Sequence, residues 1–273
     1  MCLAIFAIDV RDDWPLIVLA NRDEFHARPT QSMQPWADAP EILAGRDLQA
    51  GGTWLGIDTR ARLALLTNVR DPKNVKHNAP SRGKLAETFL RGNQSAQAYL
   101  KALAPDAMRY NGFNLVLIDA DQRKWHASNY QEPLSATLPT GVHGLSNALF
   151  DTPWPKTERT KLALANYLSR ADTLQPDALC DIMLDTAPVD DALLPNTGLS
   201  LSRERLLGTP FIVSQEYGTR CTTLVLRHRS GRCWVQEDTY DSAGKRSRRT
   251  CWQLMPGQGW QLTEREPGSL NTC

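Results

Sequence analysis

MCLAIFAIDV, residues 1–10, opens the chain with a cysteine directly behind the initiator methionine and at the head of an apolar run. If Met1 is removed, Cys2 carries both a thiol and a free α-amine, whose pKa is about 8. A single residue then supplies a nucleophile and its base, as in N-terminal-nucleophile catalysis. The alternative is that Cys2 is a small apolar residue at the start of a buried strand.

The second apolar run follows closely and predicts a hairpin with the first. Residues 15–20 (PLIVLA) come after a turn-like segment, residues 11–14, so the two runs are expected to pair as antiparallel strands. The second run leads directly into Asn21-Arg22-Asp23-Glu24. In an antiparallel pair the end of the second strand lies beside the start of the first, which predicts that Arg22 and Asp23 lie near Cys2.

Polar clusters also end or begin several other predicted strands. They are Asn21–Asp23, Thr67–Asn68, Leu145–Asn147 and Tyr217–Cys221. Strand ends are places where a rigid scaffold holds polar groups against one cleft, so the clusters together predict a site. Any one of them alone is better explained by a turn or a cap.

The remaining pattern predicts more hairpins than βαβ crossovers. Strands are expected at 53–58, 62–69, 113–119, 124–128 and 140–147, and helices at 81–90, 95–104, 154–171 and 175–185. In the helix at 154–171, the apolar face is expected to contain Leu162, Ala165, Leu168 and Ala171. The pattern as a whole indicates an α+β fold, with largely antiparallel sheets covered by helices, in a single domain over residues 1–273.

Two segments complete this prediction. Residues 26–40 are expected to be irregular because Pro29, Pro35 and Pro40 each remove a backbone donor. At the C-terminal end, residues 210–213, 217–228, 232–238 and 249–254 are expected to form an antiparallel meander.

Composition excludes several classes of function. With 31 Lys and Arg against 30 Asp and Glu, the net charge gives no reason to expect a nucleic acid or an anionic membrane as partner. The six cysteines show neither CxxC pairs nor zinc-site spacing, so no metal is expected. The chain also lacks the features of a signal peptide and any run long enough to span a bilayer, which predicts a soluble, cytoplasmic protein.

The motifs taken together resemble the NRDE family, also called the transport-and-Golgi-organisation protein 2 family. The matching blocks are Met1-Cys2, Asn21–Phe25, Gly51–Gly56, Leu66–Arg70, Leu145–Asn147 and Tyr217–Arg220. The match extends from residue 1 to about residue 254, essentially the whole chain.

This family is in turn distantly similar to the cysteine N-terminal-nucleophile hydrolases related to penicillin V acylase, bile salt hydrolase and acid ceramidase. That similarity implies a four-layer sandwich of helices, two sheets and helices. It also implies, by motif order, a nucleophile at Cys2, a clamp for the thiolate and the α-ammonium at Arg22 and Asp23, oxyanion donors at Asn68 and Asn147, and a link to the C-terminal strands at Arg220.

These roles agree with elementary chemistry. A thiolate needs positive charge nearby, which the guanidinium groups of Arg22 and Arg220 supply because they do not deprotonate. Negative charge that develops on an attacked carbonyl needs preorganised donors, and losing one costs about 10²-fold to 10³-fold in rate. The acidic role stays open between Asp23 and Glu24, because the hydrolases place their aspartate about three residues after the arginine.

Two functions therefore remain. The first is a cysteine amidohydrolase or acyltransferase that acts on a small amide or acyl conjugate and needs no cofactor, with substrate contacts expected from Asn21, Glu24, Trp54, His26 and His77. The second is a non-catalytic carrier of haem, acyl-lipid or acyl-CoA, because the NRDE family is associated with haem trafficking and lipid homeostasis. His26 and His77 would then be candidate axial haem ligands. Retention of Met1 would exclude the self-base mechanism. The oligomeric state is left open.

Overall fold

Two antiparallel sheets packed face to face form the centre of the computed structural model, which describes residues 2–263. Sheet I has the strand order β10 (Gly141–Leu145), β1 (Cys2–Ile8), β2 (Leu16–Phe25), β11 (Tyr217–Arg227), β12 (Cys233–Tyr240), β13 (Arg246–Leu254) and β14 (Trp260–Leu262). Sheet II has the order β3 (Thr30–Trp36), β4 (Ala39–Asp47), β5 (Leu55–Asp58), β6 (Leu63–Asn68), β7 (Phe113–Ile118), β8 (Lys124–Ser128) and β9 (Ser135–Thr137).

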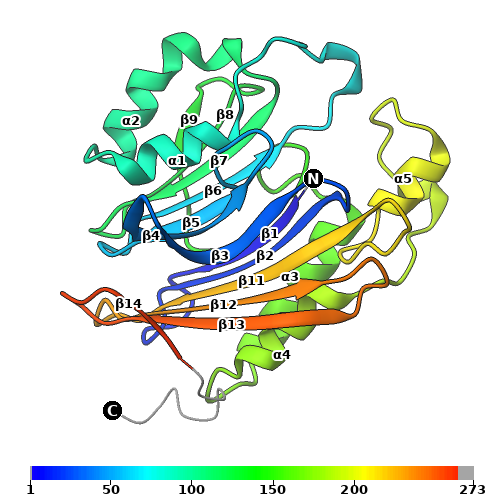
Figure 1. Ribbon diagram of the computed structural model, residues 1–273. Coiled ribbons are helices and arrows are strands. Elements are labelled where there is room, and N and C mark those ends of the chain that lie inside the picture. Colours follow the sequence, from blue (N-terminus) through cyan, green and yellow to red (C-terminus); the bar gives the residue numbers. More distant parts are fainter. Residues whose placement is uncertain (1, 264–273) are drawn as a thin grey trace.

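Helices cover the outer face of each sheet (Figure 1). On sheet II lie α1 (Gly83–Arg91) and α2 (Ala96–Leu103), and on sheet I lie α3 (Pro155–Leu168) and α4 (Pro176–Asp181). The remaining helical segments are α5 (Leu201–Leu207) and the short turns η1 (Pro72–Asn74), η2 (Ala104–Arg109), η3 (Ile182–Leu184) and η4 (Asp191–Leu193). The α+β class and the four-layer sandwich are confirmed.

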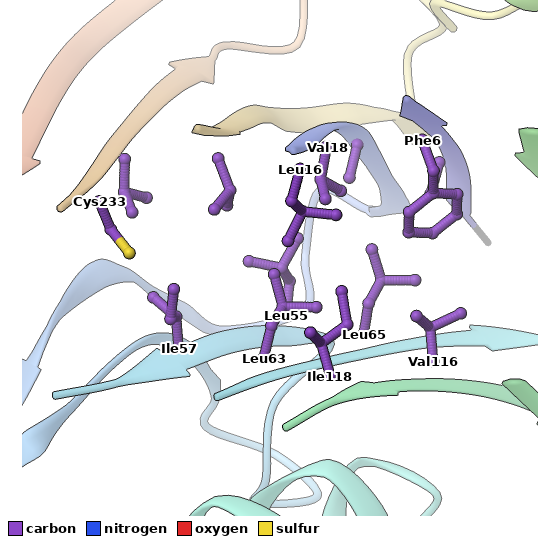
Figure 2. Packing of buried hydrophobic residues seen from close by; sticks show 14 of the residues in the cluster. Phe6, Leu16, Val18, Leu55, Ile57, Leu63, Leu65, Val116, Ile118 and Cys233 are labelled. Carbon is purple, nitrogen blue, oxygen red and sulfur yellow. The ribbon is translucent and has the colours of Figure 1, made fainter. Parts of the chain in front are cut away.

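Side chains of β1 and β2 alternate between the two faces of sheet I, as the two-residue period of a strand requires. Even-numbered positions such as Phe6, Leu16 and Val18 point into the core between the sheets, where they meet Leu55 and Leu63 of sheet II (Figure 2). Odd-numbered positions such as Leu3, Ile5 and Leu19 pack instead against the α3–α4 layer. This alternation also decides which way the polar residues at the strand ends face.

The predicted N-terminal hairpin is confirmed, and its register places Cys2 directly opposite Arg22. The polar cluster does not end the second strand, because β2 continues through it to Phe25. That extension is possible because β11 pairs with β2 from Leu16 to Phe25 and supplies partners for the polar residues as well.

The prediction that residues 26–40 are irregular is wrong. They contain β3 and the start of β4, and β3 is an edge strand of sheet II. Pro35 lies where the β3–β4 register shifts, and an edge strand tolerates proline because its outward N–H needs no ladder partner.

Two further predictions need correction. Residues 210–213 form no strand, although Phe211 and Ile212 are buried beneath the start of β11. Helix α3 is present, and Leu168 of its predicted apolar face is buried, but Leu162 is 61% exposed. The other buried residues of α3 are Lys156, Thr157, Thr160 and Leu164. The apolar spacing misplaced part of the buried face because polar side chains occupy most of it.

Candidate active site

A polar cleft of about 340 Å³ opens where β1 and β2 meet the start of α1 and the loop before it. It is lined by Cys2, Arg22, Asp23, Glu24, Arg28, Asp47, Ala50, Thr53, Trp54, Leu66, Asn68, Ala79, Pro80, Ser81, Arg82, Gly83 and Asn111. Six of the predicted site residues thus border one space: Cys2, Arg22, Asp23, Glu24, Trp54 and Asn68.

Cys2 and Arg22 face the cleft side by side. They are cross-strand partners at even positions of β1 and β2, so both side chains lie on the face between the sheets. The Arg22 guanidinium lies 4.2 Å from the ring centroid of Trp54, which holds it in place by a cation–π contact. Its Nη1 atom is buried and has no hydrogen-bond partner. Trp54 therefore contributes to the cleft wall by positioning Arg22.

Asp23 faces the opposite side of sheet I, toward the α3 layer. Its carboxylate accepts a hydrogen bond from Thr219 Oγ1 at 2.7 Å, and it interacts electrostatically with Lys156 of α3. Burial raises the pKa of Asp23, while Lys156 and the Thr219 hydrogen bond lower it. Asp23 thus supports Cys2 from behind the strand, and it is also among the residues that line the cleft.

The Cys2 thiol is partly buried, and burial raises its pKa above the ordinary value. The positive charge of Arg22 and a hydrogen bond from the backbone of Asp23 act in the opposite direction, whereas the charge of Asp23 acts with burial. The side chain consequently rests as a thiol and needs a base before it can attack. Met1, on which the predicted α-amine base depends, lies outside the described residues.

Asn68 and Asn147 come together where the two sheets meet. Asn147 is buried, and its Nδ2 donates to the Asn68 backbone carbonyl at 2.9 Å. Its neighbour Ser146 donates from Oγ to the Cys2 carbonyl at 3.2 Å. Of the two asparagines, Asn68 lines the cleft, while Asn147 fixes the position of Asn68 relative to Cys2.

Arg220 lies outside the cleft. It occupies the point where the β2–β11 register shifts, and its Nη1 donates to the carbonyls of Phe25, His26 and Arg28. It therefore ties the chain that leaves β2 to sheet I, which agrees with a link to the C-terminal strands but not with a direct contact to the Cys2 thiol.

Asn21 and the two histidines are also placed away from the cleft. Asn21 is at an odd position, so it faces the helical layer, where Nδ2 donates to the carbonyls of Met183 and Pro210. His26 Nε2 contacts the Ser214 carbonyl at 3.1 Å, and His77 is exposed in the loop before α1. None of these three residues is among those that line the cleft.

Glu24 does line the cleft. One of its oxygens accepts from the backbone N–H of Phe25, and the other lies 3.7 Å from Arg28, which also binds Asp47 at 2.7 Å. Since Asp23 interacts electrostatically with Lys156 behind the strand and Glu24 pairs with Arg28 in the cleft, the two acids have separate environments.

Sequence reasoning missed three charged residues of this region: Arg28, Arg82 and Lys156. Lys156 is fully buried, its Nζ donates to the Leu207 carbonyl at 2.9 Å, and burial lowers its pKa to about 8. The available signal was a lysine at the second position of α3, followed by Thr157 and Thr160. For Arg82 the available signal was its position directly after residues 71–81, a segment that contains Pro72, Pro80 and several polar residues.

The family model for Transport and Golgi organisation 2 matches residues 1–242 of this chain. The chain belongs to this family. Among curated members of the Transport and Golgi organisation 2 family, the mouse homolog is 33% identical over 249 residues, covering 85% of this chain and 90% of its own. The human homolog is 35% identical over 247 residues (83% and 88%), and the Drosophila melanogaster protein is 28% identical over 267 residues (88% and 92%).

Solved structures with the same fold come from hydrolases. A C2A mutant of conjugated bile acid hydrolase from Clostridium perfringens superposes with a TM-score of 0.50 at 7% identity, covering 97% of each chain. A Caenorhabditis elegans ortholog of N-acylethanolamine-hydrolyzing acid amidase also gives 0.50, at 9% identity over 82% of this chain and 92% of its own. At these identities the likeness shows the fold alone.

The two histidines predicted as haem ligands do not line the cleft. No histidine is among the residues that line it, and His26 is bound to a backbone carbonyl elsewhere. Within residues 2–263, no three His, Cys, Asp or Glu side chains lie together as a metal site would require. No helix in the same part of the chain has the length and apolar character to span a membrane.

Proposed function

We propose that this protein is a cysteine amidohydrolase or acyltransferase of the N-terminal-nucleophile type, with Cys2 as nucleophile toward a small amide or acyl conjugate. The main support is the pairing of Cys2 with Arg22 on one face of the hairpin, at the wall of a polar cleft. The fold is also shared with two proteins whose names describe hydrolases.

In the first half-reaction, removal of Met1 frees the α-amine of Cys2, which accepts the thiol proton. The sulfur then attacks the substrate carbonyl carbon, and the C=O electron pair moves onto oxygen. The side-chain amide of Asn68, which borders the cleft, donates toward this oxyanion. When the intermediate collapses, the C–N bond breaks and the leaving amine takes the proton from the α-ammonium, so that a thioester remains on Cys2.

In the second half-reaction, water attacks the thioester and gives a proton to the α-amine, which returns it to the departing sulfur. A second amine or alcohol in place of water makes the same site an acyltransferase. Because burial raises the pKa of the thiol, the α-amine is needed as the base, and Arg22 stabilises the thiolate only once it forms. Asp23, held by Thr219 and Lys156, orients the ammonium group.

The proposed reaction belongs in the cytoplasm. The cysteines at positions 2, 180, 221, 233 and 251 are all free thiols, which fits a reducing compartment where Cys2 stays unmodified.

Intact-mass analysis followed by acyl trapping tests the proposal. The purified protein is expected to lack Met1 and to gain the mass of one acyl group at Cys2 when mixed with short-chain acyl amides or thioesters. Cys2→Ala is expected to abolish both the adduct and turnover, whereas Cys221→Ala, which changes another buried cysteine, is expected to keep them. Full retention of Met1, or turnover that survives Cys2→Ala, would refute the mechanism.

A further inference from the structure

Two guanidinium groups border the cleft without a carboxylate partner. Among residues 2–263, neither Arg22 nor Arg82 makes an ion pair, whereas Arg28 in the same cleft is paired with Asp47 and Glu24. Arg22 is 5% exposed and its Nη1 has no hydrogen-bond partner. Burying a charge without a partner is costly, so the arrangement favours an anion that completes these contacts.

Arg82 is held rigidly enough to act as a recognition group. Its Nη1 donates to the Gly112 carbonyl at 2.9 Å, which anchors one end of the planar guanidinium. The start of α1 behind it is fixed by the Gly51–Gly52 turn, where a Cβ on Gly52 would lie 2.4 Å from the Gly83 carbonyl carbon. The Thr53 N–H also donates to the Gly83 carbonyl. Preorganisation of this kind lowers the entropy lost when a ligand binds.

Arg82 is electrostatically coupled to the nucleophile. Burial lowers its pKa, and the charges of Cys2 and Glu24 act in the opposite direction. The second anchored guanidinium therefore lies within electrostatic reach of the reacting sulfur. Because Glu24 is also near, the surplus of positive charge is small and suits a monoanion better than a dianion.

We infer that Arg82, together with Arg22, forms a carboxylate subsite beside Cys2, so that the preferred substrates are amides carrying a carboxylate a few bonds from the scissile carbonyl. A carboxylate matches the fork of a guanidinium, and its charge-assisted hydrogen bonds are about twice as strong as neutral ones. The assignment of a substrate class rests on the proposed function, but binding of a carboxylate at the subsite can be tested without turnover.

The direct test compares alkylation of Cys2 by iodoacetate and by iodoacetamide, read as the mass of the N-terminal peptide. The two reagents differ in charge but attack the same thiolate, so their rate ratio cancels any change in thiolate fraction. Relative to the same ratio for 2-mercaptoethanol, wild-type Cys2 is expected to favour iodoacetate by roughly tenfold, as one charge-assisted hydrogen bond implies.

Variants then assign the preference. Arg82→Gln is expected to lower the ratio about tenfold, Arg82→Lys is expected to keep part of it, and Arg109→Gln, at an exposed arginine outside the cleft, is expected to leave it unchanged. Equal ratios in wild type and Arg82→Gln would overturn the inference. If Arg82→Gln does not fold, a second measurement uses the wild type: millimolar acetate is expected to slow the alkylation of Cys2 by iodoacetamide. Absence of this protection counts against the subsite.

Two further arms separate the alternatives. If inorganic phosphate protects Cys2 better than acetate does, the cleft binds a phosphoryl group and the carboxylate assignment is overturned.

Turnover is tested with two carboxylate-bearing amides, butanoylglycine and succinamic acid, each compared with the neutral compound in which its carboxylate is an amide. For at least one of the two pairs, kcat/KM of the carboxylate is expected to be about tenfold higher than kcat/KM of the neutral compound. Turnover without this preference refutes the subsite alone, while a charge-dependent alkylation ratio without any turnover refutes the proposed function alone.

Discussion

Lys156 is the buried residue whose replacement gives the clearest physical signal. It is 2% exposed, and burial lowers its pKa from the ordinary 10.5 to about 8, although Asp23 and Glu204 favour its charged form. Each pKa unit corresponds to about 1.4 kcal/mol, so this displacement corresponds to about 3 kcal/mol. The unfolded chain therefore binds a proton at this position between pH 8 and pH 10.5 that the folded protein does not.

The sign of the pH dependence follows from this difference in bound protons. Stability rises with pH wherever the unfolded state binds more protons, so Lys156 lowers stability below pH 8 and this cost disappears as pH rises to 10.5. In Lys156→Met the group is absent. The unfolding free energy of the wild type minus that of the variant is thus expected to increase by about 3 kcal/mol between pH 7.5 and pH 10.5.

Urea unfolding at several pH values, with reductant present, measures this difference. Lys161→Met is the matched control on the same helix. Hydrogen bonds to Glu158 and Asp151 outweigh burial and raise the pKa of Lys161, so its contribution is expected to fall as the pH rises past 10.5. A wild-type-minus-Lys156→Met difference that is flat across the range would refute the assignment of a buried lysine with a depressed pKa.

Three other substitutions test the packing around the site. Glu204→Gln leaves Arg70, its partner at 2.7 Å, buried without a counter-charge and is expected to cost about 3–5 kcal/mol in urea unfolding; a loss below about 1 kcal/mol would contradict this. Leu63→Ala empties a fully buried position between the sheets and is expected to cost about 2–5 kcal/mol by the same measurement. Gly52→Ala combines a φ of +79° with a clash at the start of α1, so it is expected to lower the Tm, whereas Gly259→Ala meets nothing within 4 Å and is the control; equal Tm values would count against the tight turn.

The hairpin and its consequence for the site were predictable because both rest on local rules. Two apolar runs separated by a short turn pair antiparallel, and that pairing alone brings Arg22 opposite Cys2. Strand alternation then places the side chains of Arg22 and Asp23 on opposite faces of the sheet. Which of the two faces the cleft can be stated only once the register is known.

What sequence reasoning missed depends on contacts between distant segments. Lys156 was overlooked because apolar spacing points to the exposed Leu162 face of α3, whereas the buried face is polar in order to meet Asp23. The strand β3 was overlooked because tolerance of proline depends on lying at a sheet edge. Arg82 became a site residue only through the packing of α1 against the Gly51–Gly52 turn.

The position of the N-terminal hairpin in sheet I also bears on the order of folding. Its two strands lie within residues 2–25, yet their outer neighbours are β10 and β11, which begin at residues 141 and 217 (Figure 1). The β1 edge of the hairpin therefore stays unpaired until β10 is synthesised and the β2 edge until β11 is synthesised, and such edges readily template aggregation. Because these closures span long stretches of sequence, the fold is expected to form slowly. The residues that line the cleft all lie between Cys2 and Asn111, but the sheet that supports Cys2 and Arg22 is complete only when β11 pairs with β2.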